Sequence, residues 1–212
     1  MSTFLVVLDV DSTLIENEVI DLLADAAGSR AEVAAITAAA MNGELDFETS
    51  LRSRCATLAG LPVSVFEQVG SLVQLTTGVP ELVTGVHRNG GLIAVVSGGF
   101  HEIVDPLADA LGLDRCRANR LDVRDGLLTG GVRGEVVDAQ AKADTLREWA
   151  ADFGIPMRQT IVVGDGANDL EMMAASGLSV GFDAKAPVRE EADVIMDVRD
   201  LTQVLPLLGL RG

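Results

Sequence analysis

The sequence lacks the clustered basic residues that a nucleic-acid or membrane-surface protein needs. It has 16 Lys and Arg against 32 Asp and Glu in 212 residues, so the formal net charge is −16. Binding to a duplex or to an anionic membrane requires a local concentration of cations. The sequence also lacks the run of roughly 20 apolar residues that spans a bilayer. We therefore expect neither a nucleic-acid nor a membrane partner.

Cysteine is scarce and a secretory signal is not evident. Cys55 and Cys116 have no metal-ligand spacing and no histidine near them in sequence, which favours incidental thiols in a reducing compartment. The apolar start at Phe4 is short, lacks a basic flank and runs directly into Asp9. These features predict a cytoplasmic protein.

Lysine is the rarest of the charged residue types. Only two lysines, Lys142 and Lys185, accompany 14 arginines. If the substrate is an anion, local cations must overcome the repulsion of an acidic protein. Each lysine is therefore a candidate for a specific role.

Short apolar runs separated by helical patterns predict an α/β fold with a doubly wound parallel sheet. The length suits one domain with a sizeable insertion. An alternating segment at 121–137, with turn signals at Asp125-Gly126 and Gly130-Gly131, predicts a small β-hairpin appendage. The runs that we expect to form strands are Phe4–Leu8, Leu92–Val96, Ile161–Val163, Leu178–Val180 and, more weakly, Val194–Met196.

A long helical segment separates the first two predicted strands. A crossover needs only about a dozen residues, whereas this one runs from 16 to 77. The excess predicts an inserted helical cap at 16–77 on a core formed by 1–15 and 78–212. The expected cap helices are Val19–Ala27, Ala31–Met41, Phe47–Leu58 and Val63–Gln74.

Acidic residues follow two of the predicted strands. Asp9 and Asp11 end the first strand, and Asp165 follows Ile161–Val163 with Asn168 and Asp169 close behind. Parallel strands deliver such residues to one sheet edge, where crowded carboxylates need a cation, and Mg²⁺ is the candidate. If strand geometry continues, Asp9 and Asp11 point the same way, one as nucleophile and one as proton donor.

Simpler interpretations of these acidic residues stay open. The first pair could be an acidic turn in which Ser12 or Thr13 caps the next segment. Asn168 and Asp169 could be helix caps, although a cap requires only one such residue.

A serine–glycine turn and a lysine offer anion contacts. Ser97-Gly98-Gly99 follows the second strand and is expected to open a helix at Phe100, with backbone N–H groups forming an anion cradle. Lys142 lies in the first turns of a helix capped by Asp138, where a cation opposes the helix dipole and needs a compensating anion. Alternatively, the turn is a tight one that glycine permits, with Ser97 as a helix cap, and Lys142 is solvated. His101, next to the turn, is expected to be a surface helix residue.

The four motifs in this order resemble the haloacid dehalogenase superfamily, and within it the family of phosphoserine phosphatases. They are Asp9-Val10-Asp11-Ser12-Thr13, Ser97-Gly98-Gly99, Lys142 and Gly164-Asp165-Gly166-Ala167-Asn168-Asp169. The resemblance implies a Rossmann-like core and Mg²⁺-dependent hydrolysis of O-phospho-L-serine, the last step of serine biosynthesis. It further implies a small-molecule substrate and either a monomer or a homodimer.

The resemblance also assigns roles to residues. Asp9 would form an aspartyl-phosphate and Asp11 would act as acid and then base. Mg²⁺ would be held by Asp9, the Asp11 carbonyl and Asp165, with Asp169 supporting it through water or Lys142. The phosphoryl group would bind Ser97, Gly98 and Lys142, and the remaining substrate would bind Glu18, Met41, Phe47, Arg54 and Asn168. From pattern alone, Phe47 is a core residue and Glu18 a solvated helix acid.

Three alternatives stay open. A phosphotransferase of the same fold would share the site and pass phosphate to another alcohol such as homoserine. A phospho-accepting receiver domain also has acidic residues, a Ser or Thr and a lysine around Mg²⁺, but it needs a durable phosphoryl group, which Asp11 would remove. A silent binding protein would not need every reactive position filled.

Overall fold

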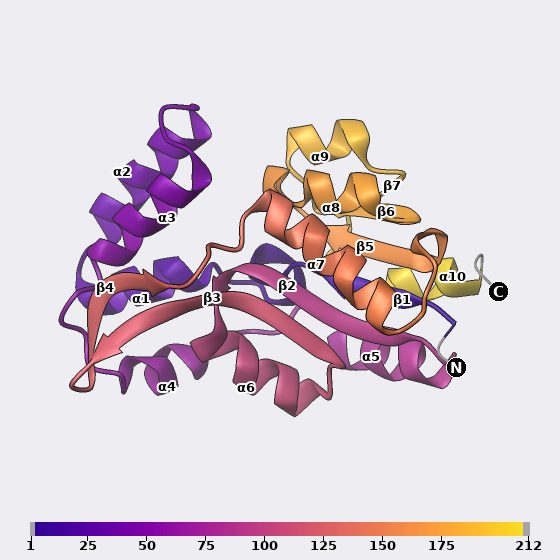
Figure 1. Cartoon of the computed structure of the whole chain (residues 1–212), viewed down its shortest axis with the longest axis horizontal. Helices are drawn as coiled ribbons and strands as arrows, with labels where there is room; N and C mark the ends of the chain where they lie inside the picture. Colours follow the sequence, from indigo (N-terminus) through magenta and orange to yellow (C-terminus); the bar gives the residue numbers. More distant parts are fainter. Residues whose placement is uncertain (1–2, 210–212) are drawn as a thin grey trace.

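The computed structural model describes residues 3–209 and shows a mostly parallel seven-stranded sheet between two helical layers (Figure 1). The strand order is β4-β3-β2-β1-β5-β6-β7, and only β4 runs antiparallel to its neighbour. The strands are β1 Leu5–Leu8, β2 Leu92–Phe100, β3 Arg115–Arg124, β4 Leu127–Arg133, β5 Thr160–Gly164, β6 Leu178–Phe182 and β7 Val194–Met196. The predicted α/β class is confirmed.

Helices connect the strands and cover both faces of the sheet. Short 3₁₀ turns lie at Met157–Gln159, Ala167–Asp169 and Leu201–Val204. The α-helices are α1 Val19–Ala27, α2 Arg30–Met41, α3 Phe47–Ala56, α4 Val65–Gly70, α5 Val79–Arg88, α6 His101–Leu111, α7 Ala139–Asp152, α8 Leu170–Ala175, α9 Ala186–Glu191 and α10 Leu205–Leu208. Within residues 3–209, no helix combines the length and apolar character needed to cross a membrane.

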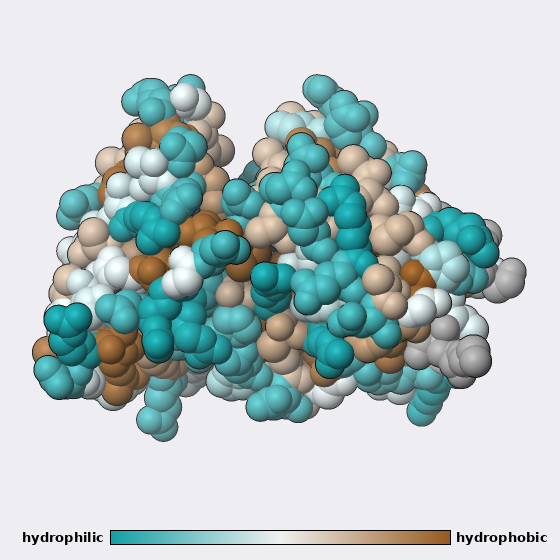
Figure 2. Space-filling model, viewed as in Figure 1, coloured by the Kyte–Doolittle hydropathy of each residue, from teal (hydrophilic) through white to brown (hydrophobic). Residues whose placement is uncertain are grey.

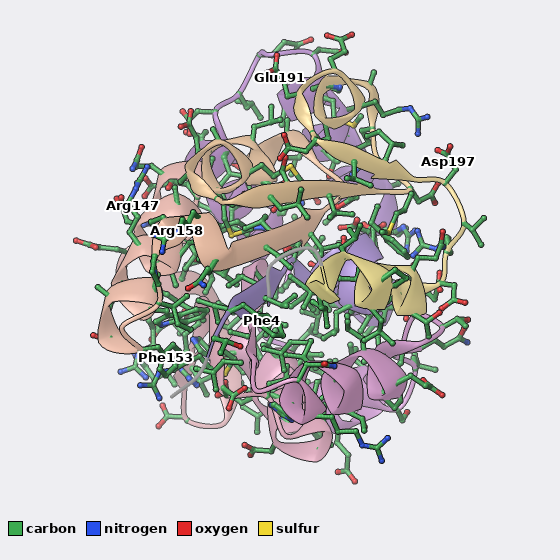
Figure 3. The ribbon with its side chains drawn as sticks, turned by 90° about the vertical axis from the view of Figure 1, so that its right-hand side faces the viewer. Phe4, Arg147, Phe153, Arg158, Glu191 and Asp197 are labelled. Atoms are coloured by element: carbon green, nitrogen blue, oxygen red, sulfur yellow. The ribbon has the colours of Figure 1, made fainter. Side chains whose placement is uncertain are left out.

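Alternation along β1 divides its side chains between two apolar clusters, because successive residues of a strand point to opposite faces. Leu5 and Val7 pack with Leu146 and Trp149 of α7 and with α8 and α9. Val6 and Leu8 pack with α5, α6 and the residues of α1, α3 and α4. Figure 3, viewed from the side of the termini, shows the sheet between these layers, with Phe4 inside and Arg147 and Glu191 at the periphery. The central strand β1 is therefore buried on both faces.

Helices α1 to α4 lie between β1 and β2 in the chain, as expected for the cap. The boundaries 16–77 stay a prediction, but the two connections of this insert are paired. Ile15 forms an antiparallel bridge with Leu75, and the Glu16 N–H donates to the Gln74 carbonyl at 2.8 Å. The insert therefore leaves and rejoins the core at one place, beside the end of β1.

The predicted hairpin is present as β3 and β4, but it is more closely integrated than the sequence indicated. β3 begins at Arg115 and pairs in parallel with β2, so the hairpin extends one edge of the main sheet. Its outer strand also contacts the insert: the Gly60 N–H donates to the Leu128 carbonyl, and the Leu128 N–H donates to Leu61, both at 2.8 Å.

Candidate active site

A cavity lies at the carboxyl ends of β1, β2 and β5, between the sheet and the helical insert. Figure 2 shows the molecular surface hollowed between the lobe formed by α2 and α3 and the region of α8 and α9. The cavity combines residues that are far apart in sequence: Asp9, Asp11, Glu18, Ile20, Phe47, Leu51, Arg54, Gly98, Gly99, Phe100, Asp165, Asn168 and Lys185.

Asp9 and Lys142 form the buried centre of the site. The Lys142 side chain has no exposed surface, and its Nζ donates to Asp9 Oδ1 at 2.7 Å and to Asp169 Oδ1 at 2.8 Å. As predicted, Asp138 caps α7 by accepting a hydrogen bond from the Ala141 N–H at 2.8 Å, which places Lys142 in the first turn. The predicted compensation of this buried cation is therefore present as two carboxylates.

Electrostatics keep Asp9 less acidic than an ordinary aspartate. Burial raises the pKa of Asp9 to about 7, and the neighbouring Asp169 adds to this rise while Lys142 opposes it. The pKa of Lys142 is raised above its usual value, because attraction by Asp169 and Asp9 outweighs desolvation. When both are ionised, Asp9 and Asp169 carry one negative charge more than Lys142 neutralises, so this centre attracts a cation.

Asp11 reaches the same cavity by a different route from the predicted one. The strand ends at Leu8, and the residues from Val10 to Leu14 form a kinked helical turn in which Ser12 has φ +59°. The Asp11 carboxylate accepts a hydrogen bond from the Val19 N–H at 3.2 Å. The expectation of continued strand alternation was wrong, because the loop rather than the pleat brings Asp11 beside Asp9.

The surroundings of the Asp11 carboxyl favour its protonated form. Burial, followed by repulsion from Glu18 and from Asp9, raises the pKa of Asp11 well above its usual value. The hydrogen bond from Val19 opposes this shift. A carboxyl with these neighbours retains a proton under conditions in which an ordinary aspartate is ionised.

The predicted anion cradle is part of a strand rather than a turn before a helix. β2 continues through Ser97-Gly98-Gly99 to Phe100, and α6 begins only at His101. The pairing with β3 is irregular between Val96 and Phe100, which frees the intervening backbone from the regular ladder. Gly98 lies under the insert, since a Cβ there would be 2.9 Å from Phe47 Cζ.

Three buried carboxylates can hold a metal ion. Oxygens of Asp9, Asp165 and Asp169 lie within 4.8 Å of one another, and all three residues are buried. Hard oxygen donors of this kind suit Mg²⁺. Three of the four residues predicted to bind metal are therefore close together, and Asp11, predicted to act through its carbonyl, is not in this group of carboxylates.

Lys185 also contacts this cluster, although the sequence marked it only as a candidate for some specific role. Its Nζ lies 2.8 Å from Asp165 Oδ2, and it lines the cavity from the start of α9. The scarcity of lysine was the one signal that could have identified it, because both lysines of the chain contact the site carboxylates.

The insert supplies the opposite wall of the cavity. Glu18, Phe47 and Arg54 all line it, and Asn168 does so from the core. The Ser12 hydroxyl donates to Glu18 Oε1 at 2.7 Å, so the acid is held by the loop that carries Asp11. Phe47 also packs against the core cluster, so its expected core role and its place in the cavity coexist.

Met41 is not brought to the site. It ends α2 with 77% of its surface exposed and does not line the cavity. Its predicted contribution to the pocket has no support in this conformation, because its helix ends at the outer tip of the insert.

His101 and Cys116 are not isolated, contrary to the sequence interpretation. His101 Nε2 accepts a hydrogen bond from the Ala118 N–H at 3.0 Å, and its Nδ1 contacts Asp105, to which the Cys116 thiol donates. Burial raises the pKa of Cys116 to about 11 and that of Cys55 to about 12. His101 and Asp105 are four residues apart on α6, and folding brings Cys116 of β3 to them.

A family model described as haloacid dehalogenase-like hydrolase matches residues 6–174. The chain belongs to this family. The match includes the segments that carry Asp9, Ser97, Lys142 and Asp165, so the predicted superfamily is confirmed.

Two relatives and one solved structure show which members of this family the chain resembles. A phosphoserine phosphatase of Streptomyces coelicolor is 53% identical over 97% of this chain, but the chain spans about half, 50%, of that relative's length. A phosphoserine phosphatase of Streptococcus thermophilus is 49% identical, over 98% of this chain and 97% of its own. A solved structure named "Phospho-Aspartyl Intermediate Analogue of Phosphoserine phosphatase" is 42% identical with a TM-score of 0.92, covering 98% of this chain and 100% of the other.

Proposed function

We propose that this chain is a Mg²⁺-dependent phosphatase that hydrolyses O-phospho-L-serine to L-serine and phosphate. The observation that carries the proposal is the composition of one cavity. Its sheet wall presents Asp9 and Asp11, and its insert wall presents Glu18 and Arg54. The first pair suits phosphoryl transfer, and the second matches the ammonium and carboxylate of an amino acid.

In the first half of the proposed reaction, an Asp9 oxygen attacks phosphorus and the bond from phosphorus to the seryl oxygen breaks. Asp11 gives its proton to the departing oxygen, since a free alkoxide is a poor leaving group. In the second half, Asp11 accepts a proton from water as the water attacks the same phosphorus. Phosphate leaves and the Asp9 carboxylate is restored.

The phosphoryl oxygens would contact Ser97, the Gly98 N–H and Lys142. Phosphoryl transfer depends mainly on positioning and on neutralising charge. Asp9, the Asp11 carbonyl, Asp165 and Asp169 would hold Mg²⁺, which when bound supplies positive charge to the phosphoryl group. Lys142 keeps Asp9 oriented, because its ammonium donates to one Asp9 oxygen.

The insert would recognise the amino-acid part of the substrate. Glu18 would pair with the ammonium and Arg54 with the carboxylate, for which the arginine fork is suited. Arg54 donates its Nε hydrogen bond to the Ser50 carbonyl at 3.4 Å, and no carboxylate among residues 3–209 pairs with it. Phe47, Asn168 and, in a more closed arrangement, Met41 would shape the remaining pocket.

The comparisons support this proposal through names. The two curated relatives are called phosphoserine phosphatases, and the similar solved structure is named for a phospho-aspartyl intermediate analogue. A hydrolase family model also favours a phosphatase over a receiver domain. The cytoplasmic location and the choice between monomer and homodimer stay predictions.

A substrate panel tests the proposal. Phosphate release is measured with Mg²⁺ from O-phospho-L-serine, a sugar phosphate and p-nitrophenyl phosphate. We expect phosphoserine to be turned over far faster than the sugar phosphate, because only phosphoserine offers charges for both Glu18 and Arg54. Equal rates on these substrates would refute phosphoserine as the specific substrate and would leave a general phosphatase. Addition of homoserine distinguishes the phosphotransferase, which would yield phosphohomoserine in place of free phosphate.

A further inference from the structure

Asn119 is a buried polar residue with no role in the chemistry described so far. It lies on β3 opposite Phe100 of β2, and only 1% of its surface is exposed. This position follows the irregular part of the pairing between β2 and β3, where Ser97-Gly98-Gly99 leave the ladder. A backbone segment without ladder bonds needs other partners.

The side chain of Asn119 supplies one such partner and also contacts a second segment. Its Nδ2 donates to the Gly98 carbonyl at 2.8 Å, and its Oδ1 accepts from the Val137 N–H at 2.8 Å. The orientation of the amide is determined, because a carbonyl can only accept and a backbone N–H can only donate. The residue therefore joins β2 to the segment before α7 with both ends of its amide.

On the β2 side, this bond fixes the peptide that follows Gly98. The carbonyl of that peptide accepts from Asn119, and its N–H, which belongs to Gly99, donates to Ser97 Oγ at 2.8 Å. Ser97 is fully buried beside the cavity-lining Gly98, and because its Oγ accepts this bond, its own hydrogen is left to donate to a further acceptor. The orientation of the Ser97 hydroxyl thus depends on a peptide that Asn119 holds.

At its other end, the Asn119 amide binds Val137, which lies just before α7, the helix that carries Lys142. Val137 is followed by Asp138, which caps α7, and the Lys142 N–H donates to the Asp138 carbonyl at 2.9 Å. Asn119 therefore fixes the start of this helix one residue before its cap. The two segments that it joins are those that carry Ser97, Gly98 and Lys142.

We propose that Asn119 is a positioning residue that sets the distance between the Ser97-Gly98 cradle and Lys142, and thereby the affinity of the site for a phosphoryl group. This inference rests on the proposed function, which assigns phosphoryl contacts to those residues. Asn119 would affect binding of the phosphoryl group of any substrate. Binding of the amino-acid part, at Glu18 and Arg54, would not depend on it.

The test is Asn119→Ala in the full chain with Mg²⁺, with inorganic phosphate as the probe. We expect the inhibition constant of phosphate to rise about tenfold, the factor that corresponds to about 1.4 kcal/mol for a lost buried hydrogen bond. KM should rise by a similar factor for phosphoserine and for p-nitrophenyl phosphate. A rise for phosphoserine alone would contradict the proposal.

Ser179→Ala is the matched control. Ser179 is also buried and also joins two segments, since its hydroxyl donates to Asp193 Oδ2 and accepts from the Asp193 N–H, both at 2.9 Å. We expect a similar loss of thermal stability with an unchanged inhibition constant of phosphate. If Asn119→Ala behaves like this control, Asn119 is only structural and the proposal is overturned.

A second variant covers the case in which Asn119→Ala does not fold. Asn119→Asp keeps the shape and the acceptor for Val137, but an ionised carboxylate cannot donate to Gly98. At alkaline pH, we expect the same rise in the inhibition constant, and an unchanged constant would overturn the proposal. A wild-type protein that neither hydrolyses a phosphomonoester nor binds phosphate would instead refute the proposed function, and the inference with it.

Discussion

The sheet wall of the cavity and the insert wall differ in how firmly their side chains are held. On the sheet side, Lys142, Asp9 and Asp169 are buried and joined by short ion pairs. On the insert side, Arg54 is partly exposed, and the one hydrogen bond of its guanidinium within residues 3–209, to the Ser50 carbonyl, is long at 3.4 Å. In the proposed mechanism, Asp9 and Lys142 are thus positioned before a substrate arrives, whereas Arg54 retains freedom to adjust.

The largest expected effect concerns the sheet wall. Asp9→Asn should reduce turnover of phosphoserine and of p-nitrophenyl phosphate by more than about a thousandfold, because loss of a nucleophile removes the covalent route. Steady-state phosphate release measures both rates. Undiminished turnover would refute the proposed mechanism. A loss confined to phosphoserine would show that Asp9 acts on substrate recognition, as the insert wall is proposed to do, and not on phosphoryl transfer.

Replacement of Lys142 tests whether the sheet wall is held by charge. In EDTA, Lys142→Met should lower the free energy of unfolding by about 3–5 kcal/mol, because it leaves buried carboxylates without their cation. Urea unfolding measures this change, and Mg²⁺ should reduce the deficit by neutralising the same carboxylates.

Lys185→Met is the matched control for this change. Its ion pair with Asp165 is about half exposed, so the expected cost is at most about 1 kcal/mol. Equal losses in the two lysine variants would show that burial does not distinguish them.

Arg54 tests the insert wall. Arg54→Ala should raise KM for phosphoserine about tenfold or more, as expected for loss of a charged hydrogen bond, and leave p-nitrophenyl phosphate nearly unchanged. Arg52→Ala is the control, since Arg52 lies on the same helix and pairs with the exposed Glu48. A uniform loss on both substrates would give Arg54 a structural role.

The smallest effect concerns the thiols, which lie outside both walls. Burial raises the pKa of Cys55 to about 12 and that of Cys116 to about 11, so the reactive thiolate is rare at neutral pH. Iodoacetamide should label the folded protein much more slowly than the unfolded chain, as mass spectrometry can follow. Rapid labelling of Cys55 in the folded state would indicate that the insert opens.

The sequence was most informative where local chemistry determines placement. An apolar run followed by Asp predicted the positions of Asp9 and Asp165, and the cap at Asp138 predicted that of Lys142. The extension of β2 through two glycines was missed, because glycine favours a turn in sequence statistics and only the neighbouring strand overrides it. The first half of β3 was missed because its polar residues, Arg115 to Arg120, give no apolar run.

Contacts between distant segments were not predictable from residue patterns. Lys185 meets Asp165, and Cys116 of β3 meets Asp105 of α6, only after the strands are ordered. Asn119 gave no signal at all, since its role depends on two backbone groups. Met41 is the opposite case: the family resemblance implied that it lines the pocket, but it is exposed in the structure. Its position depends on the arrangement of the whole insert, which the sequence pattern does not give.

The contact between the insert and β4 has a consequence for engineering. β4 is the terminal strand of the sheet, and residues 60–61 satisfy the backbone of Leu128 on its open side. A truncated core without the insert would present an unpaired strand, which is a template for joining other chains. The insert, which is proposed to recognise the substrate, would therefore also protect the protein from self-association. A core engineered without the insert would need another segment to cover the edge of β4.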